Sequence, residues 1–301
     1  ALSVLVEVDE EGQRRGFRLV ESVVRSAARL DYEQVQRALD GSSGSGAAAA
    51  GRQLLVTMQQ LAGKLHSRRL QRGALDLDVP EPLAQVDAGG RTVRLGQRAR
   101  LASHRLIEEF MLVANESVGQ YASQRRLPVV YRVHPPPAGP KLGRLAAAVP
   151  GLSAVADAPV APVALQRWLR SIAGRPDAPV LRRLLLQALA RAAYAADDQG
   201  HFGLACHRYL HFTAPIRRYP DLLVHRVVKA AVRQELTDES ADRLRQTLEW
   251  TARWTSRCEQ RADEAERAYL RRKQLRYLAE HAGEEYAGTV AGVVRGGVFV
   301  E

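Results

Sequence analysis

The sequence predicts an α+β fold in which an antiparallel sheet is flanked by several helices. Residues 1–20 alternate between apolar and polar side chains around a Glu-Glu-Gly turn, which is typical of a β-hairpin. After Gly283 the sequence alternates again, so strands are expected at both ends of the chain. Four segments between these ends have patterns typical of helices: 101–125, 181–194, 220–234 and about 239–282.

Composition is that of a soluble globular protein. The 301 residues are 46% hydrophobic and 26% charged, enough for one large domain or two smaller ones. No run of about 18 apolar residues occurs, so we expect no membrane span. Cys206 and Cys258 lie far apart and form no CxxC or Cys/His cluster. We therefore expect neither a disulfide framework nor a zinc site, and a cytoplasmic location. The opening ALSVLVEVDEEG lacks signal-peptide features and begins as a strand, so we expect a piece of a longer chain.

The charge balance is strongly basic. Lys and Arg number 44 against 33 Asp and Glu, which gives a formal net charge of +11. Such an excess indicates a polyanionic partner, most often nucleic acid. Most of the excess is arginine, which binds phosphate bidentately and stacks on bases. The alternative is that the arginines reflect genomic base composition, and charge alone leaves both explanations open.

After the hairpin, the first hundred residues are predicted to hold two helices and another strand. The segment ARLDYEQVQRALDG predicts a short helix that Asp31 caps and Gly41 ends. The low-complexity run GSSGSGAAAAG at 41–51 predicts a flexible loop. RGALDLDVPE predicts a strand that ends at Pro80. Between loop and strand, residues 52–71 predict an amphipathic helix from these apolar positions: Leu54, Leu55, Met58, Leu61 and Leu65.

The rest of the chain is predicted to be mainly helical. Residues 134–180 are rich in Pro, Ala and Gly and predict irregular structure wrapped on the core, with short helical pieces such as 163–172. The closing YAGTVAGVVRGGVFVE alternates around Gly296–Gly297, which predicts a hairpin that opens a second, β-rich domain. In the helix predicted at 101–125, one apolar stripe recurs every three or four residues: Ile107, Met111, Ala114, Val118 and Tyr121.

The stretch HFTAPIRRYPDLLVHR concentrates three arginines and two prolines. Pro215 suits the start of a turn, and Pro220 cannot lie inside a continuing helix, so the backbone must turn at 217–219. Asp221 then falls in the first turn of a new helix, where the macrodipole favours an anion. Arginines on a stiff turn suit phosphate, because little entropy is lost on binding. The alternative is that both arginines pair with carboxylates. The two histidines are expected to form hydrogen bonds in the core: His211 and His225.

Longer motifs resemble a known enzyme family. HFGLACHRYLHFTAPIRRYPDLLVHR resembles the catalytic-domain signature of the ribonuclease II/R (RNB) family of processive 3′→5′ exoribonucleases, with Ala214 where the family usually has Ser. The terminal YAGTVAGVVRGGVFVE resembles the first hairpin of the OB-fold RNA-binding module that follows that domain. The resemblance implies an RNB-like catalytic domain over 1–282 and the start of an OB-fold module over 283–301. Further motifs resemble family segments in the same order: SVVRSAARLDYEQVQRALDG, RRLQRGALDLDVPE, HRLIEEFMLVANESVGQY and RADEAERAY.

The resemblance also implies roles for individual residues. Arg217 matches an arginine that grips the phosphate beside the scissile bond, and Arg218 is a second candidate for binding RNA. Tyr32 matches an aromatic residue near the catalytic centre, with simple core packing as the alternative. Glu266 matches a glutamate that shapes the pocket for the RNA 3′ end.

An acidic pair is implied to contact the ribose. Glu108 and Glu109 match two carboxylates of which one contacts a ribose hydroxyl, and the resemblance does not indicate which. On an ideal helix His104, Glu108 and Asn115 share one face, which gives Glu108 polar company for an RNA-facing role. The alternative is a helix-surface acidic pair bound to Arg105.

The family implies Mg²⁺, held by an aspartate cluster spaced D-x5-D-x-D-D, and this chain contains no such spacing. The family's ligands are expected before Ala1, so no metal ligand is assigned in this chain. Asp76 and Asp78 in LDLD share a strand face, but two carboxylates alone make a poor Mg²⁺ site. Asp197–Asp198 indicates a turn. Residues 82–95 contain no Phe, Tyr or Trp, so base stacking there is expected to be weaker than in the family.

These features together predict an RNA-degrading enzyme. The complete protein is expected to act as a monomer on single-stranded RNA, hydrolysing it processively from the 3′ end to nucleoside 5′-monophosphates with Mg²⁺. One alternative is a family member that has lost catalysis and acts as an RNA-binding protein. A weaker alternative is a structural or protein-interaction module whose arginines reflect composition alone.

Overall fold

The computed structural model describes residues 1–42, 46, 51–77, 81–137, 139–149, 151–152, 160–288 and 290–300. Its mixture of helices and antiparallel strands confirms the predicted α+β class. The strands of the described residues do not form one flanked sheet, because they pair only within two-stranded antiparallel sheets. No helix in these residues is long and apolar enough to cross a membrane. The sheets are β1 (Leu2–Val8) with β2 (Arg14–Glu21), β3 (Glu81–Val86) with β4 (Thr92–Arg98), β5 (Tyr131–Val133) with β6 (Ala193–Ala195), and β7 (Val290–Val294) with β8 (Gly297–Val300).

The N-terminal hairpin forms as predicted and is fixed to a helix by its turn. β1 and β2 pair in a register that sets Val4 opposite Leu19, and both side chains pack on the main core. Gly12 in the turn has a φ of +82°. A Cβ at Gly12 would lie 2.9 Å from the Cβ of Lys64 on α3 (Arg52–Arg72), so glycine allows the turn to approach this helix closely.

The next two helices follow the sequence prediction, with one correction. In α1 (Tyr32–Leu39), Asp31 accepts a hydrogen bond from Gln34 N in a capping box. The predicted loop at 41–51 falls mostly outside the described residues. On α3 the predicted apolar face is rotated, because Leu54 is 64% exposed. The buried side of α3 consists of Leu55, Ala62, Leu65 and Arg69.

The strand predicted to end at Pro80 is wrong within its described part. Residues 74–77 run without a strand partner, and Leu75 N donates instead to the carbonyl of Gly203. The strand pair β3–β4, which was not predicted from the sequence, follows. Lys273 of α9 (Asp238–Glu280) donates to the carbonyl of Gly90 in the β3–β4 turn, which attaches this hairpin to α9.

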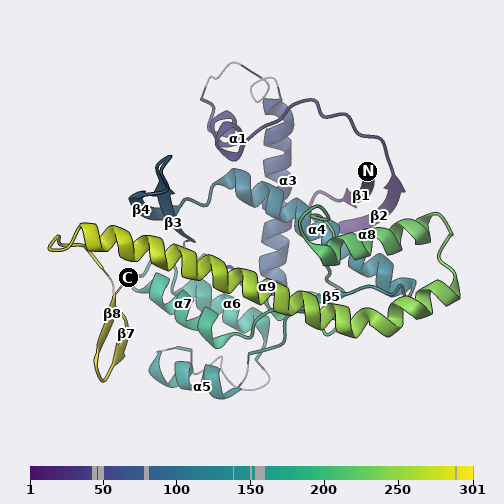
Figure 1. Ribbon diagram of the computed structural model, residues 1–301. Helices are drawn as coiled ribbons and strands as arrows, with labels where there is room; N and C mark the ends of the chain where they lie inside the picture. The colour runs from purple at the N-terminus through teal and green to yellow at the C-terminus, as the bar shows by residue number, and fades with distance from the viewer. Residues whose placement is uncertain are drawn as a thin grey trace.

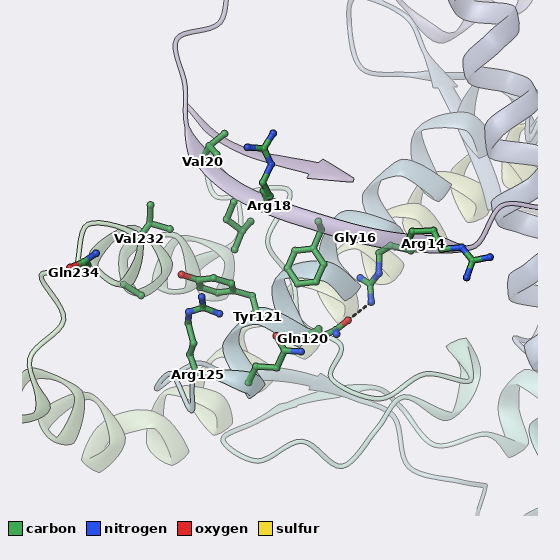
Figure 2. A pocket seen from close by; sticks show the side chains of 14 residues that line it. Arg14, Gly16, Arg18, Val20, Gln120, Tyr121, Arg125, Val232 and Gln234 are labelled. Atoms are coloured by element: carbon green, nitrogen blue, oxygen red, sulfur yellow. Dashed lines mark hydrogen bonds between the residues drawn. The ribbon is translucent and has the colours of Figure 1, made fainter. Parts of the chain in front are cut away.

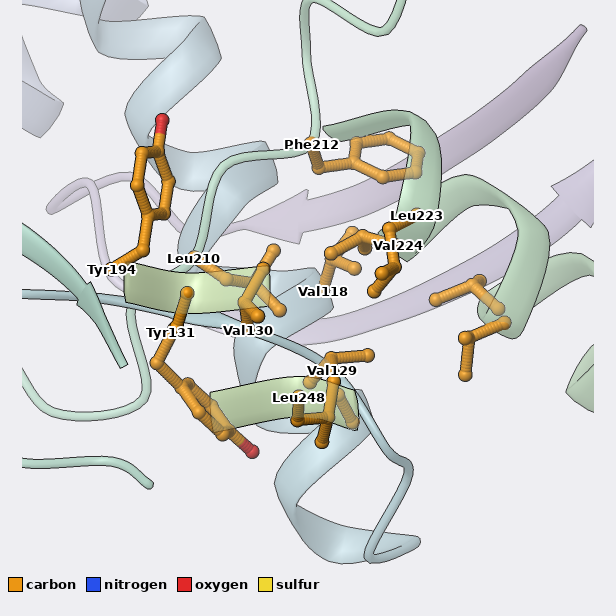
Figure 3. Packing of buried hydrophobic residues seen from close by; sticks show 14 of the residues in the cluster. Val118, Val129, Val130, Tyr131, Tyr194, Leu210, Phe212, Leu223, Val224 and Leu248 are labelled. Atoms are coloured by element: carbon orange, nitrogen blue, oxygen red, sulfur yellow. The ribbon is translucent and has the colours of Figure 1, made fainter. Parts of the chain in front are cut away.

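Helix α4 (Ala102–Gln124) runs through the middle of the fold (Figure 1). Its buried face differs from the predicted stripe: Ile107 is 39% exposed, while polar Asn115 and Ser117 are buried. The main core packs around its C-terminal half (Figure 3). The core side chains labelled there are Val118, Val129, Val130, Tyr131, Tyr194, Leu210, Phe212, Leu223, Val224 and Leu248.

The described residues of 134–180 form part of a second core rather than an irregular wrapping. Here α5 (Gly139–Ala148), α6 (Pro162–Ser171) and α7 (Ala178–Ala188) enclose apolar side chains. The predicted helix at 181–194 therefore starts earlier and ends at Ala188, and Tyr194 lies in β6. Fully or almost fully buried members of this core are Leu142, Leu152, Leu165, Trp168, Leu169, Ile172 and Leu185.

Two helices complete the fold as predicted. The short 3₁₀ turn η2 (Phe202–Leu204) leads to α8 (Tyr219–Val232), and α9 follows. Figure 1 shows α9 crossing the whole molecule, with the β7–β8 hairpin beyond its C-terminal end. Residues 295–296 form the turn of this hairpin, in agreement with its predicted alternation.

The backbone crossing at Gly119 leads to a stability prediction. A Cβ there would lie 1.7 Å from the carbonyl oxygen of Arg208, so Gly119→Ala would force two backbone segments apart. We expect a loss of unfolding free energy of about 2–3 kcal/mol or more, as for severe overpacking. The control is Gly143→Ala in α5, where a Cβ meets nothing within 4 Å and helix propensity predicts a gain of about 0.5–1 kcal/mol. Urea midpoints test both variants, and equal midpoints would contradict the close crossing.

Candidate functional site

The turn that carries Arg217 and Arg218 is held in place by the buried carboxylate of Asp221. The N–H groups of Arg217 and Arg218 both donate to the carbonyl of Ala214, at 3.2 and 3.0 Å. Asp221 has no exposed surface, and its Oδ1 accepts from Ala214 N at 2.8 Å and from Arg218 Nη2 at 2.7 Å. Pro220 lies in the first turn of α8, as predicted. From sequence alone Asp221 has only a helix-dipole role, whereas in the structure its carboxylate also closes the turn.

The two arginines have different environments. Arg218 is partly buried and bound to Asp221, so the alternative in which the arginines pair with carboxylates applies to Arg218. Arg217 is exposed and has no carboxylate partner among the residues that the structure describes. Ile216 and Tyr219 beside it are also exposed. The turn therefore presents the guanidinium of Arg217 to solvent on a rigid backbone.

Asn115 holds the segment that leads into this turn. It was predicted to face RNA, and the structure corrects this prediction. It is 2% exposed, and its Oδ1 accepts from Phe212 N at 2.9 Å. Its Nδ2 donates to the hydroxyl of Tyr209 at 3.0 Å. The amide is thus engaged at both ends inside the protein, so Asn115 positions the chain that leads to Arg217 rather than facing a ligand.

Two partly buried histidines support the same segment, and their hydrogen bonds agree with the prediction for His211 and His225. His211 Nδ1 lies 2.9 Å from the hydroxyl of Tyr194, and His225 Nε2 lies 2.8 Å from the carbonyl of Phe212. Burial lowers the pKa of His211 to about 2 and that of His201 to about 3. Both imidazoles are therefore neutral at ordinary pH and are unsuited to act as acids.

Tyr32 and His104 form a stacked pair at the start of two helices. Their ring centroids lie 4.1 Å apart with an interplanar angle of 26°. Ser103 Oγ donates to the carbonyl of Tyr32 at 2.9 Å, which ties the start of α1 to the start of α4. Tyr32 is 42% exposed, so its ring is not packed in the core and retains a surface that a ligand could cover.

The acidic pair separates into one buried and one accessible carboxylate. Glu109 is 2% exposed and bound by Arg69 Nη2 at 2.5 Å and His66 Nδ1 at 2.9 Å. Burial acts to raise the pKa of Glu109, but hydrogen bonds and charge from His66 and Arg69 outweigh it and hold the pKa below its usual value. Glu108 keeps 35% of its side chain exposed. Glu108 is therefore the carboxylate that a ligand can reach.

A network of cations that the sequence pattern does not predict surrounds these carboxylates. Arg100 binds Glu108 at 2.6 Å and approaches Asp76 to 3.5 Å, while Arg69 also contacts Glu108 at 3.3 Å. The predicted partner Arg105 is not among the ion pairs of Glu108 or Glu109 in the described part of the chain. The partners come from α3 and from the segment before α4, so no local spacing indicated them.

The carboxylates described here do not fit a metal site. In the residues that the structure covers, no three His, Cys, Asp or Glu side chains come together as metal ligands. Asp76, Glu108 and Glu109 are committed to the arginines and histidine named above, and Asp78 lies outside the described residues. A divalent ion would have to displace these cations, so no metal is assigned to this group.

Glu266 is an exposed residue of helix α9. It is exposed in the C-terminal half of α9, where residues 261–269 are all exposed. Among the described residues Glu266 makes no ion pair or hydrogen bond. Its carboxylate is free to meet a ligand.

A basic cavity of about 710 Å³ lies elsewhere, between β2 and the ends of α4 and α8 (Figure 2). Arg14 there donates to Ser117 and Gln120, and Arg125 stacks on Tyr121 with its guanidinium carbon 4.1 Å from the ring centre. None of the predicted site residues lines this cavity. Two helix C-termini meet at it, and their negative partial charges account for the arginines as part of the fold.

Comparisons with known proteins agree with the sequence motifs. A protein-family model described as the RNB domain matches residues 1–234. Ribonuclease R of Aquifex aeolicus is 36% identical over 304 residues, which cover 100% of this chain and 43% of that protein. The apo form of Mycoplasma genitalium RNase R aligns with a TM-score of 0.89 and 26% identity, covering 99% of this chain and 47% of that one. The same protein in complex with ribose methylated single-stranded RNA aligns with a TM-score of 0.88 and 25% identity, covering 100% and 48%. The chain thus spans less than half the length of these relatives.

Proposed function

The chain belongs to the RNB domain family, and from this premise we propose that its protein is a ribonuclease II/R-type exoribonuclease that degrades single-stranded RNA from the 3′ end. The observation that carries the proposal is the clamped turn that presents Arg217. This guanidinium is exposed and has no ion-pair partner among the described residues. The backbone that carries it is held by Asp221 and Asn115. Such a group binds phosphate with little loss of conformational entropy.

In this proposal Arg217 acts on the phosphate at the scissile bond. Negative charge on that group grows in the transition state, and a preorganised guanidinium stabilises it more than it stabilises the ground state. Arg218 acts through position: its bond to Asp221 at 2.7 Å fixes the turn. Asp221 and Pro220 are thus positioning residues, since they touch the arginines or their backbone and not the RNA.

The other accessible groups bind sugar and base. The exposed face of the Tyr32–His104 pair offers a surface on which a base or ribose can stack. Glu108 accepts a hydrogen bond from a ribose 2′-hydroxyl, which would favour RNA over DNA. Glu266 completes the pocket for the 3′ end from α9. These contacts involve the ribose and the flat face of a base and no base edge, so the enzyme should tolerate many sequences.

We also propose a domain division and a metal requirement for the complete protein. Residues 1–282 form the catalytic region, and 283–301 begin an OB-fold RNA-binding module. The family's chemistry uses Mg²⁺ to activate water and stabilise the leaving oxygen. The described side chains offer no site for this ion. The steps proposed for them are therefore limited to binding, orientation and charge stabilisation.

A cleavage assay with end-labelled RNA tests the proposal. The full-length protein with Mg²⁺ should shorten a 5′-labelled single strand from its 3′ end and release nucleoside 5′-monophosphates. EDTA should suppress the reaction. A 3′-blocked RNA or a DNA of the same sequence, used as the substrate instead, should not be shortened. Binding without cleavage would support an RNA-binding family member instead, and neither binding nor cleavage would contradict the proposed function.

Sequence tolerance gives a further prediction. Because the proposed contacts reach phosphate and ribose, homopolymers and mixed strands of equal length should bind within about tenfold of one another. Fluorescence anisotropy at fixed salt measures this, since affinity for nucleic acid depends steeply on ionic strength. A hundredfold preference for one short sequence would show that base edges are read and would contradict this part of the proposal.

A further inference from the structure

Helix α9 carries two exposed tryptophans that the site described above does not use. Trp250 and Trp254 are 67% and 48% exposed. Their rings stack with centroids 5.9 Å apart and an interplanar angle of 4°. They are two of the chain's three tryptophans, and Trp168 is buried in the second core. Large exposed aromatic surface of this kind usually marks a binding site.

The opposite face of α9 holds the helix to the protein, so the tryptophans point away from it. Thr251, Ala252 and Thr255 are buried between and beside them, and Leu248 belongs to the main core. Ser256 Oγ accepts a hydrogen bond from Tyr194 N at 2.9 Å, which fixes the rotation of α9 at this level. The stacked pair therefore lies on an immobile helix face and does not contribute to the core.

The charge around the pair is positive. Between residues 246 and 258 the only carboxylate in the sequence is Glu249, and it pairs with Arg253. Arg257 follows Trp254 by one turn, is exposed, and has no ion pair within the described residues. The surface thus combines two stacked indoles with a free guanidinium. Aromatic rings with flanking arginines suit single-stranded nucleic acid, where bases stack and phosphates pair with the cations.

We propose that Trp250, Trp254 and Arg257 form an accessory contact for single-stranded RNA, separate from the Arg217 turn. Bases stack on the outer faces of the two indoles, and the Arg257 guanidinium binds a neighbouring phosphate. The inference rests on the proposed function for the identity of the polymer. A second copy of this chain is disfavoured as the occupant, because the Arg257 side chains of the two copies would face one another across such an interface. A protein partner is the other occupant that the test must distinguish.

The chain contains its own reporters for this contact. Because Trp168 is buried, a change in tryptophan fluorescence on RNA binding would come mainly from the exposed pair. Cys258 is exposed and follows Trp254 by one helical turn, whereas Cys206 is buried. A fluorophore attached to Cys258 therefore sits next to the pair and labels that position selectively.

The test compares short and long RNA on the full-length protein, with EDTA present to prevent cleavage. A strand of about 5 nucleotides serves as the probe of the Arg217 turn, and one of about 25 nucleotides can also reach α9. The Trp250→Ala/Trp254→Ala variant should bind the short strand like the wild type and the long strand about tenfold or more weakly, because each stacked base contributes substantially. Arg257→Gln removes one phosphate contact and should lower the salt slope of long-strand binding by about 0.7. Leu54→Ala, another exposed apolar side chain, should change neither.

Three results would overturn the inference. One is long-strand affinity of the double variant within about twofold of wild type. Another is fluorescence of Trp250, Trp254 and labelled Cys258 that does not respond to the long strand. The third is evidence of a protein occupant. Acrylamide would then fail to quench the fluorescence of Trp250 and Trp254 before RNA is added, or the double variant would change only self-association. If wild type binds neither strand, the proposed function fails. If wild type binds both without dependence on the pair, only the accessory contact fails.

Discussion

Arg217→Ala should lower single-turnover cleavage of 3′-single-stranded RNA by about 10²–10³, the usual effect of removing one preorganised donor to a developing negative charge. The dissociation constant for the same RNA should change far less, because the other arginines still bind the RNA backbone. The two quantities are measured together, by quench-flow cleavage in the full-length protein and by binding in EDTA. A loss of rate without a matching loss of affinity is what a group acting mainly in the transition state produces.

Two control variants separate the role of Arg217 from simple charge. Arg217→Lys should recover part of the rate, because a point charge cannot reproduce the bidentate guanidinium. Arg226→Ala removes an exposed arginine from the same stretch of sequence, on the body of α8, and should leave the rate within about twofold. If Arg217→Ala cleaves within about threefold of wild type, Arg217 is a surface residue and the proposed catalytic turn is wrong.

Glu109→Gln should destabilise the fold by about 3–5 kcal/mol, the typical result of removing one partner from a buried ion pair. The substitution leaves Arg69, which is 6% exposed, without its closest anion. Glu108→Gln is the matched control on the adjacent residue. Its side chain is 35% exposed, so the unfolding free energy should change by about 1 kcal/mol or less. Urea unfolding at neutral pH measures both, and similar losses would contradict the division between a structural and a ligand-facing carboxylate.

The ion pair of Glu109 also predicts how the stability difference between wild type and Glu109→Gln depends on pH. The pKa of Glu109 is lowered in the folded state by His66 and Arg69, against the effect of burial. Its ionised form therefore stabilises the fold above the unfolded pKa of about 4.3, and this contribution is lost as pH falls through the lower folded value. The stability gap between wild type and Glu109→Gln should be larger at neutral pH than in acid. A gap that widened in acid would exclude this ionised pair as its cause.

Features set by local spacing were predictable from the sequence. The N-terminal hairpin, the Asp31 cap and the helices α4, α8 and α9 depend on alternation, capping residues and helical periodicity, which are all visible within a few residues. The turn at Arg217–Arg218 was predictable for the same reason, because Pro215 and Pro220 restrict the backbone directly. The family was recognisable from motifs whose order along the chain is itself a sequence property.

Features set by distant partners were not predictable in this way. The strand pair β3–β4 has mostly exposed side chains and lacks clear alternation, and its turn is bound by Lys273 far along the chain. The second core at 134–180 joins helices too short for their periodicity to indicate a buried face. The apolar stripe predicted on α4 was misplaced, because that helix is enclosed on several sides and buries polar residues that are bonded to other segments.

The sequence by itself thus determined the fold class, the family and the stiff turn that carries Arg217, since each depends on residues close together in the chain. Only the tertiary structure decided which polar groups remain exposed. Glu108 and Glu109 are neighbours of the same type, and they differ because Arg69 and His66 of α3 enclose one of them. Arg217 and Arg218 differ because Asp221 reaches only the second. Burying a charge is unfavourable unless it is paired, so the position of the partner fixes which charge remains free, and that position is a property of the folded chain.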